Sequence, residues 1–420
     1  MATRPSLVLQ NVRLPGSRVA DIMIADGTVR HVGAGIAADR VVDCTGLFVL
    51  PAAVDMHVHM RGGPQSAKED WESGTKSALA GGVTVVVDQP NTIPPITDPE
   101  TFRARVRDAS EHAFCHFAIN SGVTRDTPFP AMWRAGAMAF GETFFAPSSY
   151  GEAVSRPELF AALTAIRPLG GLATIHAEAV GPGADTTLQS HGQVRSPEGE
   201  LQAVREVSLT NTVGCRLHFC HLSTALSVDA AEGSIEATPH HLFLSRETFR
   251  NTDASGKVNP PLRSEKERKE LLSRWKRIDI IASDHAPHTW SEKRLPFPSA
   301  PSGLPGVETM VPLLLAEVLK KTLSLPEVIA KTSTNPAAIL GILPAGFLPG
   351  CRGDFALFNK HAVKIGAGNL HSRCGWTPFE GRMGVFPSHV IMGGAVVYEK
   401  GEFLRANPSW IPGKGCPRHC

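Results

Sequence analysis

The sequence has almost no net charge, no apolar run of membrane length and no closely paired cysteines, and each absence argues against a class of function. Lysine and arginine total 42 against 40 for aspartate and glutamate, and the net charge of +2 gives no electrostatic case for binding nucleic acid or an anionic membrane. No apolar stretch is long enough to cross a bilayer, and the N-terminus lacks the apolar core of a signal peptide. We therefore expect a cytoplasmic protein.

The eight cysteines are scattered, and none belongs to a Cys-x-x-Cys pair. This spacing is typical of reduced thiols rather than of a disulfide framework. Cys416 and Cys420, with His419 between them, could form a small metal clip, but a frayed tail over residues 408–420 is favoured because chain termini are usually loosely held. Internal repeats and low-complexity tracts are also lacking.

What the sequence does contain is most informative at residues 55–61, which read Asp-Met-His-Val-His-Met-Arg. Val58 separates His57 and His59 at the end of an apolar run, so in a strand both imidazoles point to one side and can bind one metal ion. Arg61 follows on the same face, where a guanidinium can hold a substrate carboxylate through two hydrogen bonds. An isolated His-x-His can equally end a buried strand, so the metal hypothesis needs further ligands downstream.

Candidate ligands follow a series of eight apolar runs, which cover residues 48–58, 83–87, 116–119, 137–140, 172–175, 217–220, 235–238 and 278–282. Longer stretches with helical features separate the runs, which favours parallel strands with crossover helices and suggests a (β/α)₈ barrel. Chemistry in such barrels lies at the C-terminal strand ends. The polar residues found there are Asp88, Asn91, Asn120, Glu142, His176, His221, His240 and Asp284. Their convergence on one mouth predicts a metal site.

Two local patterns complete the predicted barrel, which we assign to residues 51–349. Ser66 with Glu69, and Ser264 with Glu267, are expected to form capping boxes that open two helices. Stretches rich in glycine and proline at 182–199 and 295–306 are expected to be long loops that act as lids over the barrel mouth.

The two ends of the chain are expected to form one unit beside the barrel. Short alternating strands are predicted near the N-terminus at 7–12, 21–24 and 28–32, and near the C-terminus at 354–358, 388–392 and 395–398. We therefore predict a small β-sandwich built from residues 1–50 and 350–407.

An ordered series of short motifs extends along the chain: Asp-Met-His-Val-His-Met-Arg (55–61), Pro-Asn-Thr (90–92), Ile-His-Ala-Glu (175–178), Cys-His-Leu-Ser-Thr (220–224), Thr-Pro-His-His-Leu (238–242), Asn-Pro-Pro-Leu-Arg (259–263), Ala-Ser-Asp-His-Ala-Pro-His (282–288) and Gly-Leu-Pro-Gly-Val-Glu-Thr (303–309). Over nearly its whole length the chain thereby resembles the dihydroorotases of the amidohydrolase superfamily. Their reaction is the reversible closure of N-carbamoyl-L-aspartate to L-dihydroorotate in pyrimidine synthesis.

The resemblance implies a role for each matching residue. It implies zinc as the metal, bound by His57, His59, His176, His221 and Asp284. Asp284 would also carry the proton between the attacking water and the ring nitrogen. The substrate α-carboxylate would be held by Arg61, Asn91 and His288, and the pyrimidine ring would contact Asn259. His240, His241 and His285 are interpreted as hydrogen-bonded structural histidines.

The chain departs from the family pattern at the fourth strand. Many relatives bridge two metal ions with a carboxylated lysine there, whereas residues 136–142 contain no lysine. Some bacterial dihydroorotases place an aspartate at the position of Glu142, so we predict that Glu142 bridges two zinc ions. The alternative is a one-zinc site in which Glu142 caps a helix or pairs with a loop arginine. A second departure is Gly62-Gly63-Pro64, where relatives often carry Glu-Pro-Gly.

Two other functions remain open. A hydantoinase or allantoinase shares the histidines and the aspartate, but its substrates lack the α-carboxylate that Arg61 would hold. A non-catalytic dihydroorotase-like partner of aspartate transcarbamoylase has usually lost ligand histidines, which this chain retains. The expected partner is the small-molecule substrate, and association with an aspartate transcarbamoylase or as a homodimer are further hypotheses.

Overall fold

Eight parallel strands form a barrel in the computed structural model, which describes residues 6–145, 153–404 and 407–417. One sheet contains β6 (Ala53–Val58), β7 (Val83–Asp88) and β8 (His116–Ile119). The other contains β9 (Phe140–Phe144), β10 (Leu172–His176), β11 (Arg216–Phe219), β12 (Ser234–Ala237) and β13 (Ile280–Ile281). Parallel bridges from Ser121 to Phe140 and from Val58 to His285 join the two sheets at both edges. The barrel is therefore closed, as the sequence predicts.

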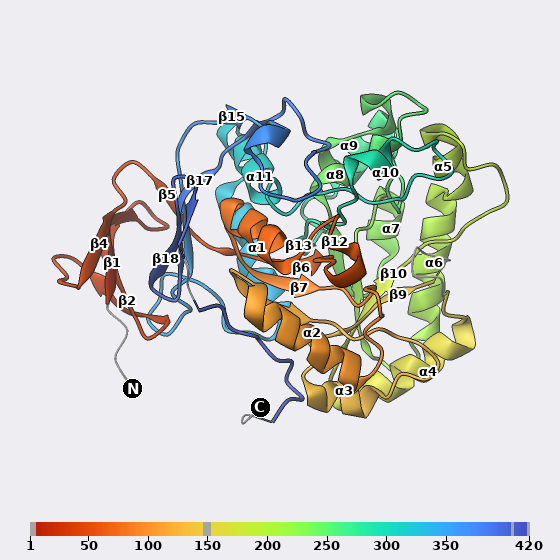
Figure 1. Ribbon diagram of the computed structural model, residues 1–420, viewed down its shortest axis with the longest axis horizontal. Helices are drawn as coiled ribbons and strands as arrows, with labels where there is room; N and C mark the ends of the chain where they lie inside the picture. The colour runs from red at the N-terminus through yellow and green to blue at the C-terminus, as the bar shows by residue number, and fades with distance from the viewer. Residues whose placement is uncertain (1–5, 146–152, 405–406, 418–420) are drawn as a thin grey trace.

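The barrel strands are buried on both faces, which explains their nearly continuous apolar sequences. Every residue of β6, β7, β9 and β10 is buried. The helices outside this barrel are α1 (Trp71–Ala80), α2 (Pro99–His112), α3 (Phe129–Ala135), α4 (Arg156–Ile166), α5 (Leu188–Val194), α6 (Pro197–Thr210), α7 (Ala225–Ala230), α8 (Pro239–Phe243), α9 (Glu265–Ser273), α10 (Trp290–Lys293), α11 (Met310–Leu319), α12 (Leu325–Ile329) and α13 (Asn335–Leu340) (Figure 1).

One of the two predicted capping boxes is confirmed. The Ser264 side chain accepts a hydrogen bond from the Glu267 backbone at the start of α9, and the Glu267 side chain accepts one from the Ser264 backbone. The box at Ser66 and Glu69 is wrong, because α1 begins at Trp71 with Asp70 as its N-cap. Glu69 is fully buried and contacts His285 Nε2 at 3.2 Å, so its carboxylate is not available to a helix start at Ser66.

The chain ends contribute two sheets that lie side by side beside the barrel (Figure 1). One has the order β3-β2-β1-β4, with strands Thr28–Gly33, Val19–Ala25, Leu7–Arg13 and Arg40–Asp43. The other has the order β19-β18-β17-β14-β5, with strands Glu402–Phe403, Ala395–Glu399, Pro387–Met392, Phe355–Phe358 and Phe48–Pro51. Side chains of both sheets share one hydrophobic cluster, which includes Leu9, Ile22, Phe355 and Ile391. A further pair, β15 (Val363–Lys364) and β16 (Met383–Gly384), stands apart.

Three predicted segments differ from the structure. The run 48–58 is split into β5 and β6, because β5 pairs antiparallel with β14 while β6 pairs with β7. The run 137–140 marks only the start of β9, so Glu142 lies inside that strand rather than after it. The expected loop 182–199 contains α5 and the start of α6, whose N-caps are Thr187 and Ser196. Local apolar patterns cannot show which sheet supplies the pairing partner.

The described part of the tail is not frayed. Residues 407–417 run along the barrel, where Ile411 N donates to Phe117 O at 2.7 Å and Trp410 pairs with Phe117 in a parallel bridge. The Trp410 ring lies 6.3 Å from the Phe102 ring. His419 and Cys420 of the hypothetical metal clip lie outside the described residues. Within the described ranges, no helix has the length and apolarity needed to span a membrane.

Candidate metal centre

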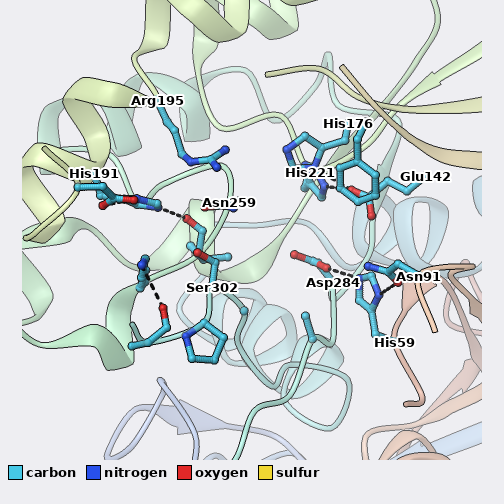
Figure 2. A pocket seen from close by; sticks show the side chains of 18 of the residues that line it. His59, Asn91, Glu142, His176, His191, Arg195, His221, Asn259, Asp284 and Ser302 are labelled. Carbon is cyan, nitrogen blue, oxygen red and sulfur yellow. Dashed lines mark hydrogen bonds and ion pairs between the residues drawn. The ribbon is translucent and has the colours of Figure 1, made fainter. Parts of the chain in front are cut away.

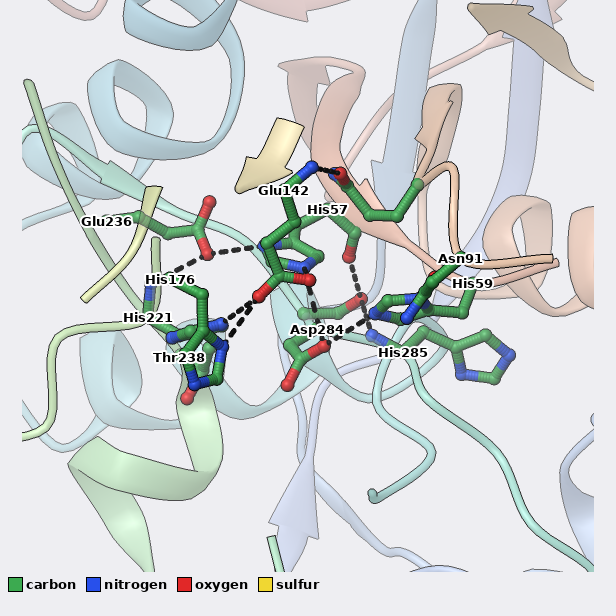
Figure 3. Close-up of polar contacts among 12 residues, drawn as sticks. His57, His59, Asn91, Glu142, His176, His221, Glu236, Thr238, Asp284 and His285 are labelled. Atoms are coloured by element: carbon green, nitrogen blue, oxygen red, sulfur yellow. Dashed lines mark hydrogen bonds and ion pairs between the residues drawn. The ribbon is translucent and has the colours of Figure 1, made fainter. Parts of the chain in front are cut away.

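Six predicted ligands converge at the C-terminal mouth of the barrel (Figure 3). They come from five different barrel strands or from the residues just beyond them, and none is more than 5% exposed. The residues are His57, His59, Glu142, His176, His221 and Asp284. The barrel thus brings together side chains that are up to 227 residues apart, as the positions of His57 and Asp284 show.

Glu142 lies between two groups of ligand atoms. Its Oε1 is 2.8 Å from His176 Nδ1 and 2.7 Å from His221 Nε2. Its Oε2 is 3.4 Å from His57 Nε2. The second group is completed by Asp284 Oδ1, which lies 3.1 Å from His59 Nε2 and 3.6 Å from His57 Nε2. One carboxylate oxygen therefore faces each group, which is the arrangement needed by a bridging ligand.

The backbone around these ligands is specialised. Gly141 has φ +125°, and a Cβ there would lie 2.1 Å from Thr174 O, so only glycine allows β9 to approach β10 so closely beside Glu142. Arg61, His221 and Asp284 also have positive φ values of 48°, 34° and 44°. Non-glycine residues rarely adopt this conformation, and strained backbone of this kind clusters at functional sites.

Three of the four histidines are oriented by an acceptor, which is buried for Glu236 and Glu178 and partly buried for Asn91. His57 Nδ1 lies 2.9 Å from Glu236 Oε1, and His59 Nδ1 lies 2.6 Å from Asn91 Oδ1. His176 Nε2 lies 3.0 Å from Glu178 Oε2. A proton held on each of these nitrogens leaves the opposite ring nitrogen as a lone-pair donor toward the centre, as in known metal sites. Sequence reasoning missed Glu236 and assigned no role to Glu178; the only signal was a carboxylate within or next to a buried strand.

The residues fit a zinc site. His57 Nε2 is buried and makes no hydrogen bond in the described part of the chain, although it points between Glu142 and Asp284. Two sets of ligand atoms each lie within 4.8 Å of one another: those of His57, Glu142 and His221, and those of His57, His59 and Asp284. Imidazole and carboxylate groups are the donors that zinc prefers alongside thiolate.

The ionisation of these groups shows that the centre is built for cations. Burial opposes ionisation of Glu142, yet the charge of His57 and hydrogen bonds from His176 and His221 outweigh it and hold the pKa of Glu142 well below its usual value. Burial likewise opposes ionisation of Asp284, but the hydrogen bond from His59 and the charge of His57 lower its pKa to about 2. Burial disfavours protonated His176, but hydrogen bonds to Glu142 and Glu178 raise its pKa to about 9. Burial also disfavours protonated His57, but the charges of Glu236 and Glu142 outweigh it and raise its pKa well above its usual value. Without a metal ion, protons on His57 and His176 therefore offset these carboxylates.

Zinc affinity is therefore expected to rise with pH. A metal ion must displace the proton from His176, and because the pKa of that group is about 9, the metal-free centre holds the proton throughout the neutral range. Each unit of pH below 9 should cost up to about tenfold in affinity per proton released. Competition with a chromogenic chelator at pH 6, 7, 8 and 9 measures this dependence, and a zinc affinity that is the same at all four values would contradict it.

A cavity of about 260 Å³ opens onto the ligands (Figure 2). Of the predicted substrate-binding residues, Arg61, Asn91 and Asn259 line it, together with Asp284. Arg61 Nε and Asn259 Oδ1 are buried and have no hydrogen-bond partner among the described residues. Burial lowers the pKa of Arg61 to about 10, so its side chain remains a cation at neutral pH. The cavity thus offers a substrate one buried cationic donor and one buried amide acceptor.

His288, which was predicted to bind the substrate, and the three predicted structural histidines lie around this centre. His288 is behind Arg61 rather than on the cavity wall, with Nε2 3.5 Å from the Arg61 guanidinium and 3.0 Å from Ser302 O. His241 Nε2 lies 2.9 Å from Pro260 O, and His285 contacts Glu69, so the structural interpretation of these two histidines is confirmed. His240 differs, because its buried Nε2 has no hydrogen-bond partner in the described ranges, and burial holds its pKa well below the usual value.

Comparison with known proteins identifies the family of this chain. The sequence model of the Amidohydrolase family matches residues 48–396. The chain belongs to the amidohydrolase family. Among curated proteins, this amidohydrolase is 38% identical to the dihydroorotase of Methanosarcina acetivorans, over 96% of each chain. It is 37% identical to the dihydroorotase of Halobacterium salinarum, over 93% of this chain and 96% of that one.

Solved structures of the same fold include hydantoinases. L-Hydantoinase (dihydropyrimidinase) from Arthrobacter aurescens superposes with a TM-score of 0.89 at 26% identity, over 97% of this chain and 100% of that one. D-Hydantoinase (dihydropyrimidinase) from Thermus sp. gives a TM-score of 0.87 at 22% identity, over 97% of this chain and 99% of that one. This amidohydrolase therefore shares its TIM-barrel architecture with the L-hydantoinase and the D-hydantoinase.

Proposed function

We propose that this amidohydrolase is a zinc-dependent dihydroorotase, which interconverts N-carbamoyl-L-aspartate and L-dihydroorotate in pyrimidine synthesis. The observation that carries the proposal is Arg61, a buried guanidinium on the wall of the cavity that holds Asp284. An unpaired buried Nε–H donor is stabilised by an anionic partner, which the α-carboxylate of dihydroorotate supplies. Hydantoin and allantoin carry no such carboxylate, so the same group would be left buried and unpaired with those substrates.

The residues divide the work as follows. His57, His59, His176, His221 and Asp284 would hold zinc, which supplies Lewis-acid polarisation of the amide carbonyl and lowers the pKa of water. Asp284 carries the proton to the ring nitrogen, because it is an ionised ligand that lines the cavity, whereas the other ionised ligand there, Glu142, contacts His176 and His221 through one oxygen and faces His57 with the other. Arg61 and Asn91 hold the α-carboxylate, with His288 bracing Arg61 from behind. Asn259 accepts a hydrogen bond from a ring N–H through its unpaired Oδ1.

A comparison of three substrates tests the proposal. Turnover is measured with L-dihydroorotate, hydantoin and allantoin on the same zinc-loaded preparation. We expect L-dihydroorotate to have the highest kcat/KM, because only this substrate pairs with Arg61. A preference for hydantoin or allantoin would replace the proposal with the hydantoinase alternative, and turnover of none of the three would favour a non-catalytic subunit.

Glu142 is proposed as the bridge between two zinc ions. Two dications a few ångströms apart repel strongly, and a shared anion between them reduces that repulsion. Glu142→Gln keeps the shape but removes the charge, so we expect zinc to fall from two ions per chain toward one. Elemental analysis after dialysis measures the ratio, and Glu308→Gln, which alters a buried carboxylate beside His371, is the matched control. Two zinc ions at full occupancy in the Glu142→Gln variant would reject the bridge.

The division of the chain and its assembly are also proposals. We assign residues 1–50 and 350–407 to one β-sandwich domain and residues 51–349 to the barrel, with 408–420 as a tail. The hydrophobic cluster shared by β1, β2, β14 and β17 supports the first assignment. Homodimer formation and association with an aspartate transcarbamoylase remain predictions, which light scattering of the protein alone and with the partner enzyme would test.

A further inference from the structure

A chain of three polar groups, two buried and one partly buried, leads away from the metal centre toward α5. His176 faces Glu142 with Nδ1 at 2.8 Å and faces Glu178 with Nε2 at 3.0 Å. Glu178 is fully buried, and its Oε2 also pairs with a guanidinium nitrogen of Arg195. Arg195 is the residue directly after α5, and its side chain lines the cavity. Figure 2 shows Arg195 directed from that side toward the ligands.

The ring orientation of His176 differs from that of the other ligands. His57, His59 and His221 turn Nε2 toward the carboxylates of the centre, whereas His176 turns Nδ1 toward them. A neutral imidazole in water carries its proton on either nitrogen, and a proton on Nδ1 would block the position that faces Glu142. A carboxylate at Nε2 accepts the proton there and leaves the Nδ1 lone pair free. Glu178 occupies that position.

We propose that Glu178 and Arg195 are a positioning pair that fixes the tautomer of His176 for metal binding and ties it to α5, whose C-terminal end borders the cavity. The proposal rests on the zinc site described above, but it concerns metal affinity and not the identity of the substrate. Arg195 holds Glu178 in place by pairing with Oε2, the same oxygen that faces His176, since a buried carboxylate needs a cationic or hydrogen-bonding partner. The other carboxylate oxygen of Glu178, Oε1, has no hydrogen-bond partner within the described residues. Arg195 and His176 therefore orient the carboxylate.

Further hydrogen bonds hold α5 in place. Arg195 O accepts a hydrogen bond from Arg263 Nη1, and Arg263 in turn contacts Glu200 of α6 at 3.4 Å. Leu188 N at the other end of α5 donates to Asn251 O at 2.7 Å. Both ends of α5 are therefore held by hydrogen bonds. Arg195, at its C-terminal end, is separated from the predicted ligand His176 by one side chain, that of Glu178.

The test measures cobalt binding, which needs no substrate. The variants are Glu178→Ala, Glu178→Gln and Arg195→Met, with Glu308→Gln as the control because Glu308 is also a buried carboxylate that hydrogen-bonds a histidine, the partly buried His371 at 2.8 Å, outside the centre. Metal-free protein is titrated with Co²⁺ while the visible d–d absorption and the number of ions bound are recorded. Glu178→Ala should weaken the ion held by His176 about 10- to 100-fold, which is the usual effect of removing a carboxylate behind a ligand histidine.

The conservative variant separates positioning from a general packing role. Glu178→Gln retains a carbonyl that accepts the His176 Nε2 proton, so it should restore most of the Co²⁺ affinity and the d–d spectrum that Glu178→Ala loses. Arg195→Met should show an intermediate loss, and Glu308→Gln should bind Co²⁺ as the unaltered protein does. Unchanged affinity and spectrum in Glu178→Ala would overturn the proposal. So would equal losses in Glu178→Ala and Glu308→Gln, because they would indicate a general effect of removing buried carboxylates.

Discussion

Replacement of Asp284 by asparagine is expected to lower kcat by about 10² to 10⁴-fold, the usual range for loss of a general acid or base. The carboxylate lies 3.1 Å from His59 Nε2 and lines the cavity, so it can both hold metal and reach the substrate. Asparagine keeps the shape of the side chain but cannot accept and return a proton. Zinc content should fall by less than activity, because four histidines and Glu142 remain. Zinc analysis on the assayed sample provides the control.

The direction of the pH effect follows from the same group. Neighbouring histidines lower the pKa of Asp284 to about 2 despite its burial, so at neutral pH the ionised form predominates. Ring closure needs the protonated form, whose fraction falls tenfold per pH unit above the pKa, and the closing rate should therefore fall as pH rises. Ring opening needs the ionised form and should not decline over the same range. Initial rates in both directions from pH 6 to 9 measure this, and an opening rate that declines with the closing rate would contradict the assignment.

The barrel was predictable from sequence because its strands are buried on both faces and read as separate apolar runs. The boundaries that failed are those set by partners distant in sequence. Residues 48–58 form one apolar run, but β14, about 300 residues later, pairs with its first part and splits it. The tail was expected to be loose on general grounds, yet Ile411 and Trp410 find partners on β8 that no local pattern reveals.

Five of the six predicted ligands stand at or just beyond a strand end, where the barrel directs side chains to one place, and so their convergence could be predicted from the sequence. Glu142 is the exception, because it lies inside β9. The residues that contact the predicted ligands or Arg61 from behind could not be predicted from the sequence. Glu236 is 179 residues from His57, whose Nδ1 it contacts, and in the sequence it is a single carboxylate inside a short strand. His288 was expected on the substrate, but its position behind Arg61 depends on the path of residues 295–306, which form no helix or regular strand. Contacts of this kind are determined by tertiary packing and not by the spacing of residues in the sequence.

Arg61→Met is expected to reduce kcat/KM for N-carbamoyl-L-aspartate by about 30- to 1,000-fold, with most of the change in KM. Loss of a charge-assisted, two-pronged contact costs on the order of 2 to 4 kcal/mol, which corresponds to that range. Arg61 is suited to this contact because it is 7% exposed, has an unpaired Nε–H and stays charged with a pKa of about 10. Methionine is unbranched, carries no charge and replaces the aliphatic part of the arginine side chain, so the cavity should lose its anchor for the carboxylate with little other change.

The same variant separates the dihydroorotase function from the hydantoinase alternative. Dihydrouracil has the ring of dihydroorotate without the carboxylate, so Arg61→Met should lower the preference for L-dihydroorotate over dihydrouracil by the same factor as it lowers kcat/KM. Arg61→Lys keeps a cation but not the planar guanidinium group. Its preference for L-dihydroorotate over dihydrouracil should therefore lie between those of the unaltered protein and Arg61→Met. Zinc content should not change in either variant, because no hydrogen bond of the Arg61 side chain to a proposed ligand is present in the described structure. Unaltered kinetics on carbamoyl aspartate with full zinc would mean that Arg61 does not hold the carboxylate, and the assignment of substrate would then fail while the metal centre stood.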